Sequence, residues 1–359
     1  MSKLRIGIIG TGGIAGLHLK SYHKLEDVEV VAGCDIVPGK AKAFFENQEC
    51  PNAKGFDSKE AMFKAVKLDA VSVCTYNTTH AECAIAALEQ GLPVLLEKPM
   101  CITMKDAHAI MAAEKKSGQF VTVGFQPRYD PNMQLVKKIV SSGELGNIYY
   151  VQTGGGRQRG MPGGTFINKK LAGVGVLGDI GCYSLDMVLN ALDYPKPLTV
   201  SAMTADHLGK NKKVNPNFYK EFTVDDFSAA FIRFEGGLVI DFRTSWAMHM
   251  DTTGATIFLG SEKGLKICPT EGPWGGAWDG SCSSISLFHD SFGIPTSTPI
   301  PLTESDWVGN FERKCRGFVE AVRTGGPAPI PTSQIIYNQA ILDGIIRSSA
   351  SGCEVKCDL

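Results

Sequence analysis

The first fifteen residues constrain the fold more than any other part of the chain. An apolar run, residues 3–9, leads directly into a G-x-G-x-x-A pattern that ends at Ala15, and residues typical of a helix follow. In such a unit Gly10 permits a tight turn, Gly12 lets a ligand approach the main chain, and Ala15 lets the helix pack on the strand. The free N–H groups of a helix start favour anions. The pattern therefore predicts a pyrophosphate site at Gly10, Gly12, Gly13 and Ile14.

A second apolar run, residues 28–34, ends at Asp35, near the spacing expected for the acid that binds the adenosine ribose of a dinucleotide. A carboxylate there accepts hydrogen bonds from both ribose hydroxyls and repels a 2′-phosphate. The next residue is Ile36, with no arginine beside it, so the sequence predicts NAD, with NADP less favoured. The alternative is a glycine-rich turn with Asp35 as a helix cap. The order strand, loop, helix, strand and acid disfavours it.

Short β-branched runs alternate with helical patterns through the first third of the chain, which predicts a doubly wound parallel sheet. Beyond residue 125 longer strand-like runs follow one another through short turns, which indicates an antiparallel or mixed sheet. We therefore predict an α/β protein with a Rossmann domain over 1–124 and a second α/β domain over 125–359. The strands expected are 4–9, 28–34, 69–74, 93–97, 120–125, 148–153, 227–234, 238–246 and 255–260, the helices 81–90 and 134–142, and the long loops 154–164 and 269–284.

Net charge, apolar runs and cysteine content indicate which partners and which cellular compartment to expect for this chain. The 359 residues carry a net charge of −1, so no strong field attracts nucleic acid or an anionic membrane. No apolar run approaches the ~20 residues that span a bilayer. The N-terminus leads straight into an expected strand, so we expect no signal peptide. Eleven cysteines without a paired C-x-x-C favour free thiols in the cytoplasm. The scattered histidines predict no metal site.

The tripeptide Glu97-Lys98-Pro99 follows the apolar run 93–96, so a lysine stands where a strand leaves the sheet. Ligands of doubly wound sheets bind at the carboxyl ends of the strands. An ammonium group there would lie against a nicotinamide and against the hydroxyl whose carbon donates a hydride. The alternative, a surface lysine that happens to follow a strand, is disfavoured by this location.

Essentially along its whole length, the chain resembles the Gfo/Idh/MocA family of nicotinamide-dependent sugar and cyclitol oxidoreductases. The resemblance implies that the second domain has a large open, mostly antiparallel sheet, one face of which packs on a partner subunit, so we expect a homo-oligomer. It rests on GIIGTGGIAGLHLKSY at the start, LEKPM at 96–100, GFQPRYDPNMQLVKKIVSSGELGNIYYV at 124–151, GVGVLGDIGCYSLDMVLNAL at 173–192, VDDFSAAFIRFEGGLVIDF at 224–242, LGSEKGLKI at 259–267 and ILDGIIRSSASGCEV near the end.

The family pattern assigns roles to particular positions. Lys98 matches the lysine at the nicotinamide, and Pro99 the proline that often follows in cis. Asp179 matches the acid of D-x-G-x-H. Tyr183 stands where most members have histidine, as in the branch resembling glucose–fructose oxidoreductase and dimeric dihydrodiol dehydrogenase. The cofactor-binding residues that the resemblance implies beyond the glycine loop and Asp35 are Thr75, Asn77, His80, Glu97, Lys98 and Arg128, although a buried salt bridge serves Arg128 equally well.

Hydride transfer from a carbinol needs a base for the hydroxyl proton and a positive field on the developing alkoxide. Tyr183 would be the base if its phenol pKa, ordinarily ~10, falls beside a cation such as Lys98. Asp179 precedes Tyr183 by four residues, so both lie on one face of a helix. We therefore predict Lys98, Asp179 and Tyr183 as the catalytic set. A buried, satisfied tyrosine and a helix-capping aspartate are the alternatives.

Polar and aromatic residues in expected loops are candidates for binding a polyol. Arg157 and Arg159 lie in the glycine-rich stretch 154–164, and Asn168 with Lys169 precedes the Asp179 segment. Trp246 and His249, with Trp274 and Trp278 in a later glycine-rich loop, would contact or stack on a sugar ring, although a lone Trp or His is more often an ordinary core or surface residue.

These observations predict an NAD-dependent oxidoreductase that transfers a hydride from a secondary ring hydroxyl of a sugar, glycoside or cyclitol to nicotinamide. One alternative is a glycoside hydrolase or epimerase that oxidises its substrate only transiently. Another is a reductase of aldehydes or keto sugars. A non-catalytic regulator that senses NAD belongs to a different class of protein, and the joint presence of Lys98, Asp179 and Tyr183 argues against it.

Overall fold

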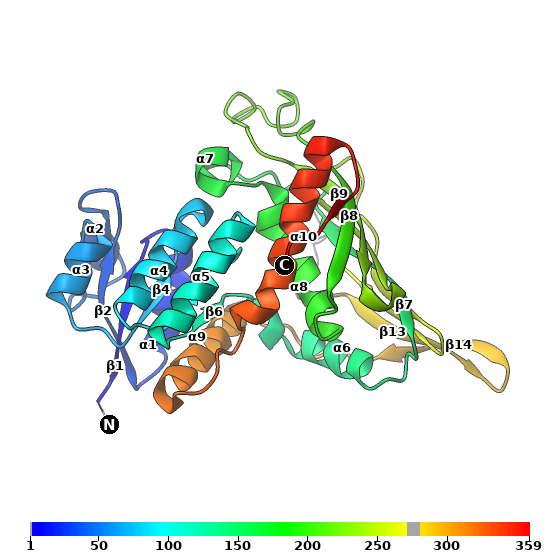
Figure 1. Ribbon diagram of the computed structural model, residues 1–359, viewed down its shortest axis with the longest axis horizontal. Coiled ribbons are helices and arrows are strands. Elements are labelled where there is room, and N and C mark those ends of the chain that lie inside the picture. The colour runs from blue at the N-terminus through cyan, green and yellow to red at the C-terminus, as the bar shows by residue number, and fades with distance from the viewer. Residues whose placement is uncertain (1, 271–280) are drawn as a thin grey trace. The chain divides into compact units, whose positions relative to one another are not determined.

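The computed structural model describes residues 2–270 and 281–359, so Trp274 and Trp278 lie outside the described residues. The chain forms two compact units (Figure 1). The first comprises Met1–Gln126 and Asp306–Ile335, and the second Pro127–Ser305 and Ile336–Leu359. The expected division at residue 124 gave all later residues to the second domain. It differs from the structure in the segment Asp306–Ile335, which folds with the first unit.

The first unit is built on a parallel sheet, as the sequence predicts. In the part of the chain that the structure describes, its strand order is β3-β2-β1-β4-β5-β6, the order of doubly wound dinucleotide-binding folds. The strands are β1 (Leu4–Ile9), β2 (Val28–Cys34), β3 (Lys54–Phe56), β4 (Ala70–Val73), β5 (Val94–Leu96) and β6 (Val121–Val123). The helices are α1 (Gly13–His23), α2 (Lys40–Asn47), α3 (Lys59–Ala65), α4 (His80–Glu89), α5 (Met104–Ser117) and α9 (Trp307–Thr324).

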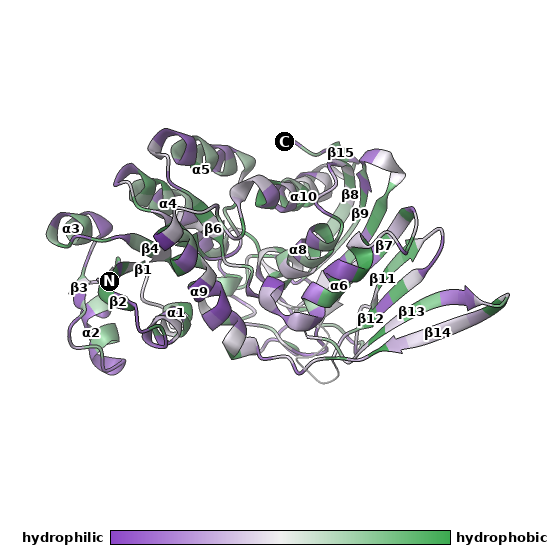
Figure 2. Ribbon diagram, turned by 90° about the horizontal axis from the view of Figure 1, so that it is seen from below, coloured by the Kyte–Doolittle hydropathy of each residue, from purple (hydrophilic) through white to green (hydrophobic). Residues whose placement is uncertain are grey.

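Helices cover both faces of this sheet: α1 and α9 lie on one face, and α4 and α5 on the other (Figure 2). The expected loop residues Gly10, Asp35, Thr75 and Lys98 all follow the carboxyl ends of strands. The fold therefore brings them to one edge of the sheet, where such folds bind their ligands.

Helix α9 belongs to the first unit because its apolar face completes that unit's core. Phe311, Cys315 and Phe318 recur at helical spacing and are 2 %, 0 % and 0 % exposed. Cys315 and Phe318 join a core cluster made largely by β1, β2 and α1, and Phe318 meets Phe120 edge to face at 6.0 Å between ring centroids. This packing explains why the segment Asp306–Ile335 departs from the expected division.

The second unit contains a large, mostly antiparallel sheet, which confirms the predicted fold class. Among the described strands the order is β14-β13-β12-β11-β7-β10-β9-β8-β15, and β7 and β10 pair in parallel. The strands are β7 (Ile148–Gly156), β8 (Pro197–Ala205), β9 (Phe227–Phe234), β10 (Val239–Ser245), β11 (Thr256–Gly260), β12 (Gly264–Cys268), β13 (Ser284–Ser291), β14 (Ile294–Ile300) and β15 (Val355–Lys356). The helices are α6 (Pro131–Ser141), α7 (Lys169–Ala172), α8 (Cys182–Ala191) and α10 (Thr332–Ser351), the last of which begins in the first unit.

One face of this sheet is covered by helices and the other is open. Figure 2 shows α6, α8 and α10 on the covered side. In β9 the side chains of Ala230 and Ile232 are buried, whereas Phe231 between them is 40 % exposed. This period of two places apolar residues on both faces of the sheet. The open face therefore carries large apolar side chains that the described residues of the chain do not cover.

The helical stretch Lys169–Ala191 is, among the described residues, long and apolar enough to cross a membrane by length and composition. It is not a continuous apolar run, because it starts with Lys169 and Lys170 and contains Asp179 and Asp186. In its most apolar window, 78 % of the residues are buried inside the protein. Core helices of folded domains give the same signal, so the stretch is weak evidence for a membrane span.

Replacing Phe318 with alanine should destabilise the first unit by about 3–5 kcal/mol, because the substitution removes a fully buried ring from the core. Chemical denaturation of the purified protein would measure the loss. Val308→Ala is a matched control on the same helix, since Val308 is 56 % exposed and should change stability by less than about 0.5 kcal/mol. Equal effects of the two substitutions would contradict the assignment of α9 to this core.

Candidate active site

The glycine loop has the geometry that a pyrophosphate needs. Gly10 has φ of +86°, and a Cβ there would lie 2.7 Å from the carbonyl oxygen of Cys74. At Gly12 and Gly13 a Cβ would meet no atom within 4 Å, so the main chain is open to a ligand. Helix α1 begins with no capping side chain and no acid in its first turn. The first main-chain N–H groups of α1, which include that of Ile14, are therefore available to bind an anionic group.

Asp35 follows β2 and is tied to the glycine loop. Its Oδ2 accepts hydrogen bonds from the main-chain N–H of Thr11 at 3.0 Å and from the Thr11 hydroxyl at 2.9 Å, and Oδ1 accepts from the N–H of Val37 at 3.1 Å. Lys40 Nζ lies 2.8 Å from Oδ2, a cation that the sequence analysis did not consider. Burial opposes the charge on Asp35, but Lys40 and Thr11 outweigh burial and hold the pKa of this carboxyl below its usual value.

Lys98 lies just beyond β5, and its peptide bond to Pro99 is cis, as the resemblance implies. The Lys98 side chain is partly exposed, whereas Glu97 before it is 4 % exposed. Glu97 Oε1 contacts Lys314 and His18 inside the first unit. That oxygen therefore belongs to a buried network within the first unit, and the expected contact of Glu97 with the cofactor stays a prediction.

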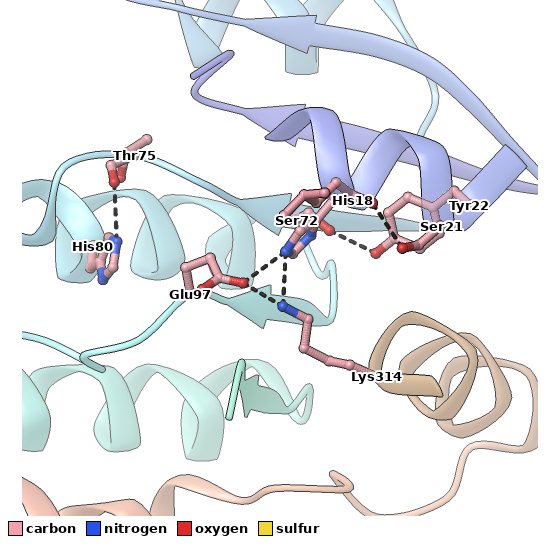
Figure 3. Close-up of polar contacts among 9 residues, drawn as sticks. His18, Ser21, Tyr22, Ser72, Thr75, His80, Glu97 and Lys314 are labelled. Carbon is pink, nitrogen blue, oxygen red and sulfur yellow. Dashed lines mark hydrogen bonds and ion pairs between the residues drawn. The ribbon is translucent and has the colours of Figure 1, made fainter. Parts of the chain in front are cut away.

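His80 connects two loops at the same sheet edge. Its Nδ1 lies 2.7 Å from the carbonyl oxygen of Pro99, and its Nε2 lies 3.3 Å from that of Thr75 (Figure 3). His80 is fully buried, and burial lowers its pKa, so the ring is neutral and has one N–H for the nearer carbonyl. His80 thus holds the main chain beside Thr75 and Lys98. Asn77, expected to bind cofactor, begins the short turn Asn77–Thr79 between Thr75 and His80.

Asp179 and Tyr183 belong to the second unit, where a π-helical turn, Leu177–Gly181, leads into α8. Asp179 is partly exposed, and its Oδ2 accepts a hydrogen bond from the indole Nε1 of Trp246 at 2.9 Å. The Ncap of α8 is Gly181, so Asp179 is not its capping residue. Tyr183 is 7 % exposed in the first turn of α8. The Asp179 carboxylate is therefore oriented by a buried donor.

Asp225 fixes the main chain that carries Asp179. Its Oδ1 accepts from the N–H of Gly175 at 2.7 Å, and its Oδ2 accepts from the N–H of Leu177 at 3.1 Å. A side chain at position 175 would overlap the carbonyl group of Asp225, so glycine is required there. Burial raises the pKa of Asp225, and the two N–H groups offset part of that effect. The turn before Asp179 is thus held by a partly buried carboxyl group.

Trp246 does not present a face to a ligand, in contrast to its expected role in substrate binding. It is fully buried, and its ring meets Phe222 edge to face at 6.2 Å. Its other neighbours in the buried cluster are Ile167, Val176, Ile180 and Val224. Trp246 therefore acts on the candidate site through Asp179 rather than by stacking on a sugar.

Arg128 forms the buried salt bridge that the sequence left open as an alternative to cofactor binding. Its Nε and Nη2 donate to the two carboxylate oxygens of Asp186 at 2.8 and 2.7 Å, and its guanidinium lies 5.2 Å from the centre of the Tyr194 ring. Asp186 lies on α8, three residues beyond Tyr183. This bidentate pair ties Arg128 to the helix of Tyr183, and its expected contact with the cofactor stays a prediction.

The remaining candidates for substrate binding are polar groups on the second unit. Arg159 and His249 are exposed and close together, with Arg159 Nη2 3.3 Å from His249 Nδ1. Arg157 follows β7 and is partly buried. Asn168 caps the short helix α7 through its side-chain oxygen, and the exposed Lys169 begins that helix. The structure therefore brings Arg159 and His249 together and gives Asn168 a local structural role.

Sequence reasoning missed several residues that hold these groups. Lys314 had a visible signal, because it interrupts the apolar face of α9. Asp225 lies in the quoted segment 224–242 but had no assigned role. The residues that Lys314 and Asp225 contact are distant in sequence, so no local pattern predicts these contacts. The other missed residues are His18, Lys40 and Asp186.

A glycine loop at the edge of a doubly wound sheet, an acid after β2 and a lysine after β5 define a dinucleotide-dependent oxidoreductase. A model of an oxidoreductase family with an NAD-binding Rossmann fold matches residues 4–125, and one of the GFO/IDH/MocA C-terminal domain matches residues 133–266. The chain belongs to the Gfo/Idh/MocA family, and its cofactor is NAD.

Individual relatives agree with this assignment. D-glucoside 3-dehydrogenase of Escherichia coli is 34 % identical over 277 residues, which cover 72 % of this chain and 78 % of the relative. Inositol 2-dehydrogenase of Salmonella paratyphi B is 36 % identical over 145 residues, 40 % of this chain and 43 % of that protein. A levoglucosan dehydrogenase solved with NADH and levoglucosan has the same fold, with a TM-score of 0.83, 20 % identity and full coverage of both chains.

Replacing Trp246 with phenylalanine keeps a buried ring and removes the N–H that orients Asp179. We expect kcat/KM to fall about 10- to 100-fold, the effect of losing a hydrogen bond to a charged group. Steady-state kinetics and a thermal melt would measure it. Phe222→Leu is the control, because it disturbs the same buried cluster without removing a partner of Asp179. An equal loss in both variants would contradict the orienting role.

Proposed function

We propose that this enzyme oxidises a secondary ring hydroxyl of a sugar, glycoside or cyclitol, with NAD as hydride acceptor. The observation that carries the proposal is the Asp179 carboxylate, held by Trp246 one helical turn before Tyr183. The first unit of the enzyme contributes the glycine loop for NAD and Lys98. The 34 % identity to a D-glucoside 3-dehydrogenase supports a glycoside as substrate.

In the proposed reaction the hydroxyl loses its proton to Tyr183, while the carbon-bound hydrogen leaves as a hydride. Bound NAD supplies the hydride acceptor, so the products are a ketone, NADH and one proton. Lys98 supplies positive charge to the developing alkoxide. Asp179 binds and orients the substrate hydroxyl. Lys98, Asp179 and Tyr183 are thus the proposed catalytic set.

Polar groups of the second unit support a polyol as the substrate. Arg159 and His249 are exposed neighbours, and Arg157 precedes Arg159 in the glycine-rich segment 154–164. Guanidinium and imidazole groups donate hydrogen bonds to the hydroxyl oxygens of sugars. We propose that Arg157, Arg159 and His249 contact the substrate, and that Lys169 lies at the edge of the binding region.

Lys98→Ala should reduce kcat at least about 100-fold, because it removes the positive charge from the reacting oxygen. The measurement is the absorbance of reduced nicotinamide, with NAD and a panel of sugars, glycosides and cyclitols. Lys105→Ala is the control, since Lys105 is exposed at the start of α5 and should have no effect on kcat. An active substrate whose turnover survives Lys98→Ala would contradict the proposed role.

The same assay separates the alternatives. A band of reduced nicotinamide that forms on the bound cofactor and never accumulates would indicate a hydrolase or epimerase that recycles NAD. Turnover only with aldehydes or keto sugars and NADH would indicate a reductase. Binding of NAD without a response to any compound, and unaltered by Lys98→Ala, would indicate a regulator.

We also propose that the open face of the second sheet joins two copies of the chain. Phe231 on β9, Met203 on β8 and Phe288 on β13 are 40 %, 49 % and 44 % exposed. Register places Phe231 and Met203 near each other, opposite Ser201 and Ala229 respectively. Apolar side chains on an exposed sheet face are typical of a subunit interface.

Phe231→Glu should therefore shift the protein from an oligomer toward a monomer, because two such faces would bring carboxylates together. Light scattering coupled to size-exclusion chromatography would show the change. Val308→Glu is the control, since it adds the same charge at an exposed position of α9. If the Phe231→Glu protein has the same molar mass in solution as the wild type, this face is not the subunit interface.

The free cysteines support a reducing compartment. All eleven are free thiols, and most are buried. We propose the cytoplasm as the location, with a small carbohydrate as partner rather than a nucleic acid or a membrane.

A further inference from the structure

Lys314 of α9 lies inside the first unit against Glu97 and His18 (Figure 3). Its Nζ is 2.5 Å from Glu97 Oε1 and 3.1 Å from His18 Nε2, and that nitrogen is 2.8 Å from the same Oε1. Lys314, Glu97 and His18 are 1 %, 4 % and 0 % exposed. They come from α9, from the end of β5 and from α1. A single carboxylate oxygen thus joins three segments that are distant in sequence.

The charges in this network balance as one ion pair. Burial would raise the pKa of Glu97, but Lys314 and His18 outweigh it and hold this pKa well below its usual value. Burial, and then Lys314, lower the pKa of His18, so its ring is neutral. The His18 Nδ1 has no hydrogen-bond partner among the described residues. The single N–H of the ring therefore belongs on Nε2, where it donates to Glu97.

The position of Glu97 is narrowly defined. Its N–H donates to the carbonyl oxygen of Val73 at 3.0 Å, and the N–H of Gly124 donates to that of Leu96 at 2.7 Å. A Cβ at position 124 would lie 2.9 Å from Glu97 Oε1, so the carboxylate packs directly on the main chain of the neighbouring loop. A movement of this carboxylate would therefore move the residue that follows it, which is Lys98.

Stability alone does not account for charged groups at this place. A buried ion pair is often replaced by apolar residues of similar volume without loss of stability. Removing one partner alone, in contrast, leaves an uncompensated charge. The pair therefore fixes the location of its carboxylate more strictly than an apolar contact would, and this carboxylate lies one residue before Lys98.

We propose that Lys314 is a positioning residue, which holds Glu97 and thereby fixes the point at which Lys98 leaves the sheet. The inference rests on the proposed function, in which Lys98 acts on the substrate hydroxyl. It makes the position of Lys98 dependent on a helix that follows more than two hundred residues later in sequence.

A double-mutant cycle tests the inference. Lys314→Met should lower kcat about 10- to 100-fold, the effect of a displacement of about 1 Å at a catalytic group, with little change in the KM for the sugar. In the Glu97→Gln background the same substitution should change kcat by no more than about twofold, because its route to Lys98 is already broken. Lys314→Arg should retain more activity than Lys314→Met. Arg316→Met, at an exposed position of α9, is the control.

The Glu97→Gln/Lys314→Met protein is the control for misfolding, because both charges of the pair are removed and neither is left buried alone. Equal losses of kcat from Lys314→Met in both backgrounds, or no loss in a folded Lys314→Met protein, would overturn the inference.

A second readout needs no substrate. The rate of reductive methylation of Lys98, measured by mass spectrometry, should change in Lys314→Met while that of Lys105 stays the same. If the wild-type enzyme oxidises no sugar, the proposed function fails, and the methylation rate still decides whether Lys314 positions Lys98. An unchanged rate at Lys98 would overturn the inference independently.

Discussion

Buried and partly buried carboxylates hold the segments that carry the candidate catalytic residues of this enzyme. A carboxylate removed from water is costly unless it is paired, so its partners determine its location. Glu97 is held by an ammonium and an imidazole, Asp186 by a guanidinium, and Asp225 by two main-chain N–H groups. Each lies beside a candidate catalytic element: Glu97 before Lys98, Asp186 on the helix of Tyr183, and Asp225 at the turn before Asp179. Each candidate catalytic residue thus lies on a segment that a paired carboxylate holds in place.

The fold was largely predictable because its signals are local. Alternating apolar residues identify β9 with the bounds that the structure has, and the strand–helix alternation gives the parallel sheet. Strand β3 was missed because its three residues are too few for a periodic pattern. The placement of α9 was missed for a different reason. Its sequence reveals an apolar face, but not that the face packs on α1 rather than in the second unit.

The candidate site divides in the same way. The glycine loop, Asp35 and Lys98 follow strands directly, so their place at the sheet edge follows from the chain itself. Trp246 was expected to contact a sugar because sequence does not reveal whether a residue beside a loop is buried, which is a tertiary property. Tertiary packing places the Trp246 ring among apolar residues and leaves its N–H to Asp179. Trp246 therefore contributes to the candidate site through its hydrogen bond to Asp179, a residue distant from it in sequence.

The contacts of Asp35 bear on how the enzyme selects its cofactor. Thr11 and Lys40 share Oδ2, whereas Oδ1 accepts a hydrogen bond from the Val37 N–H and retains capacity to accept another from a ribose hydroxyl. Lys40 offsets the negative charge that would repel a 2′-phosphate, so repulsion is weaker than Asp35 alone implies. Lys40 is also held by Asp35 itself and is 38 % exposed. Preference for NAD over NADP therefore depends more on hydrogen bonding by Asp35 Oδ1 than on the negative charge of Asp35. The Asp35–Lys40 pair as a whole determines how strongly the enzyme distinguishes the two cofactors.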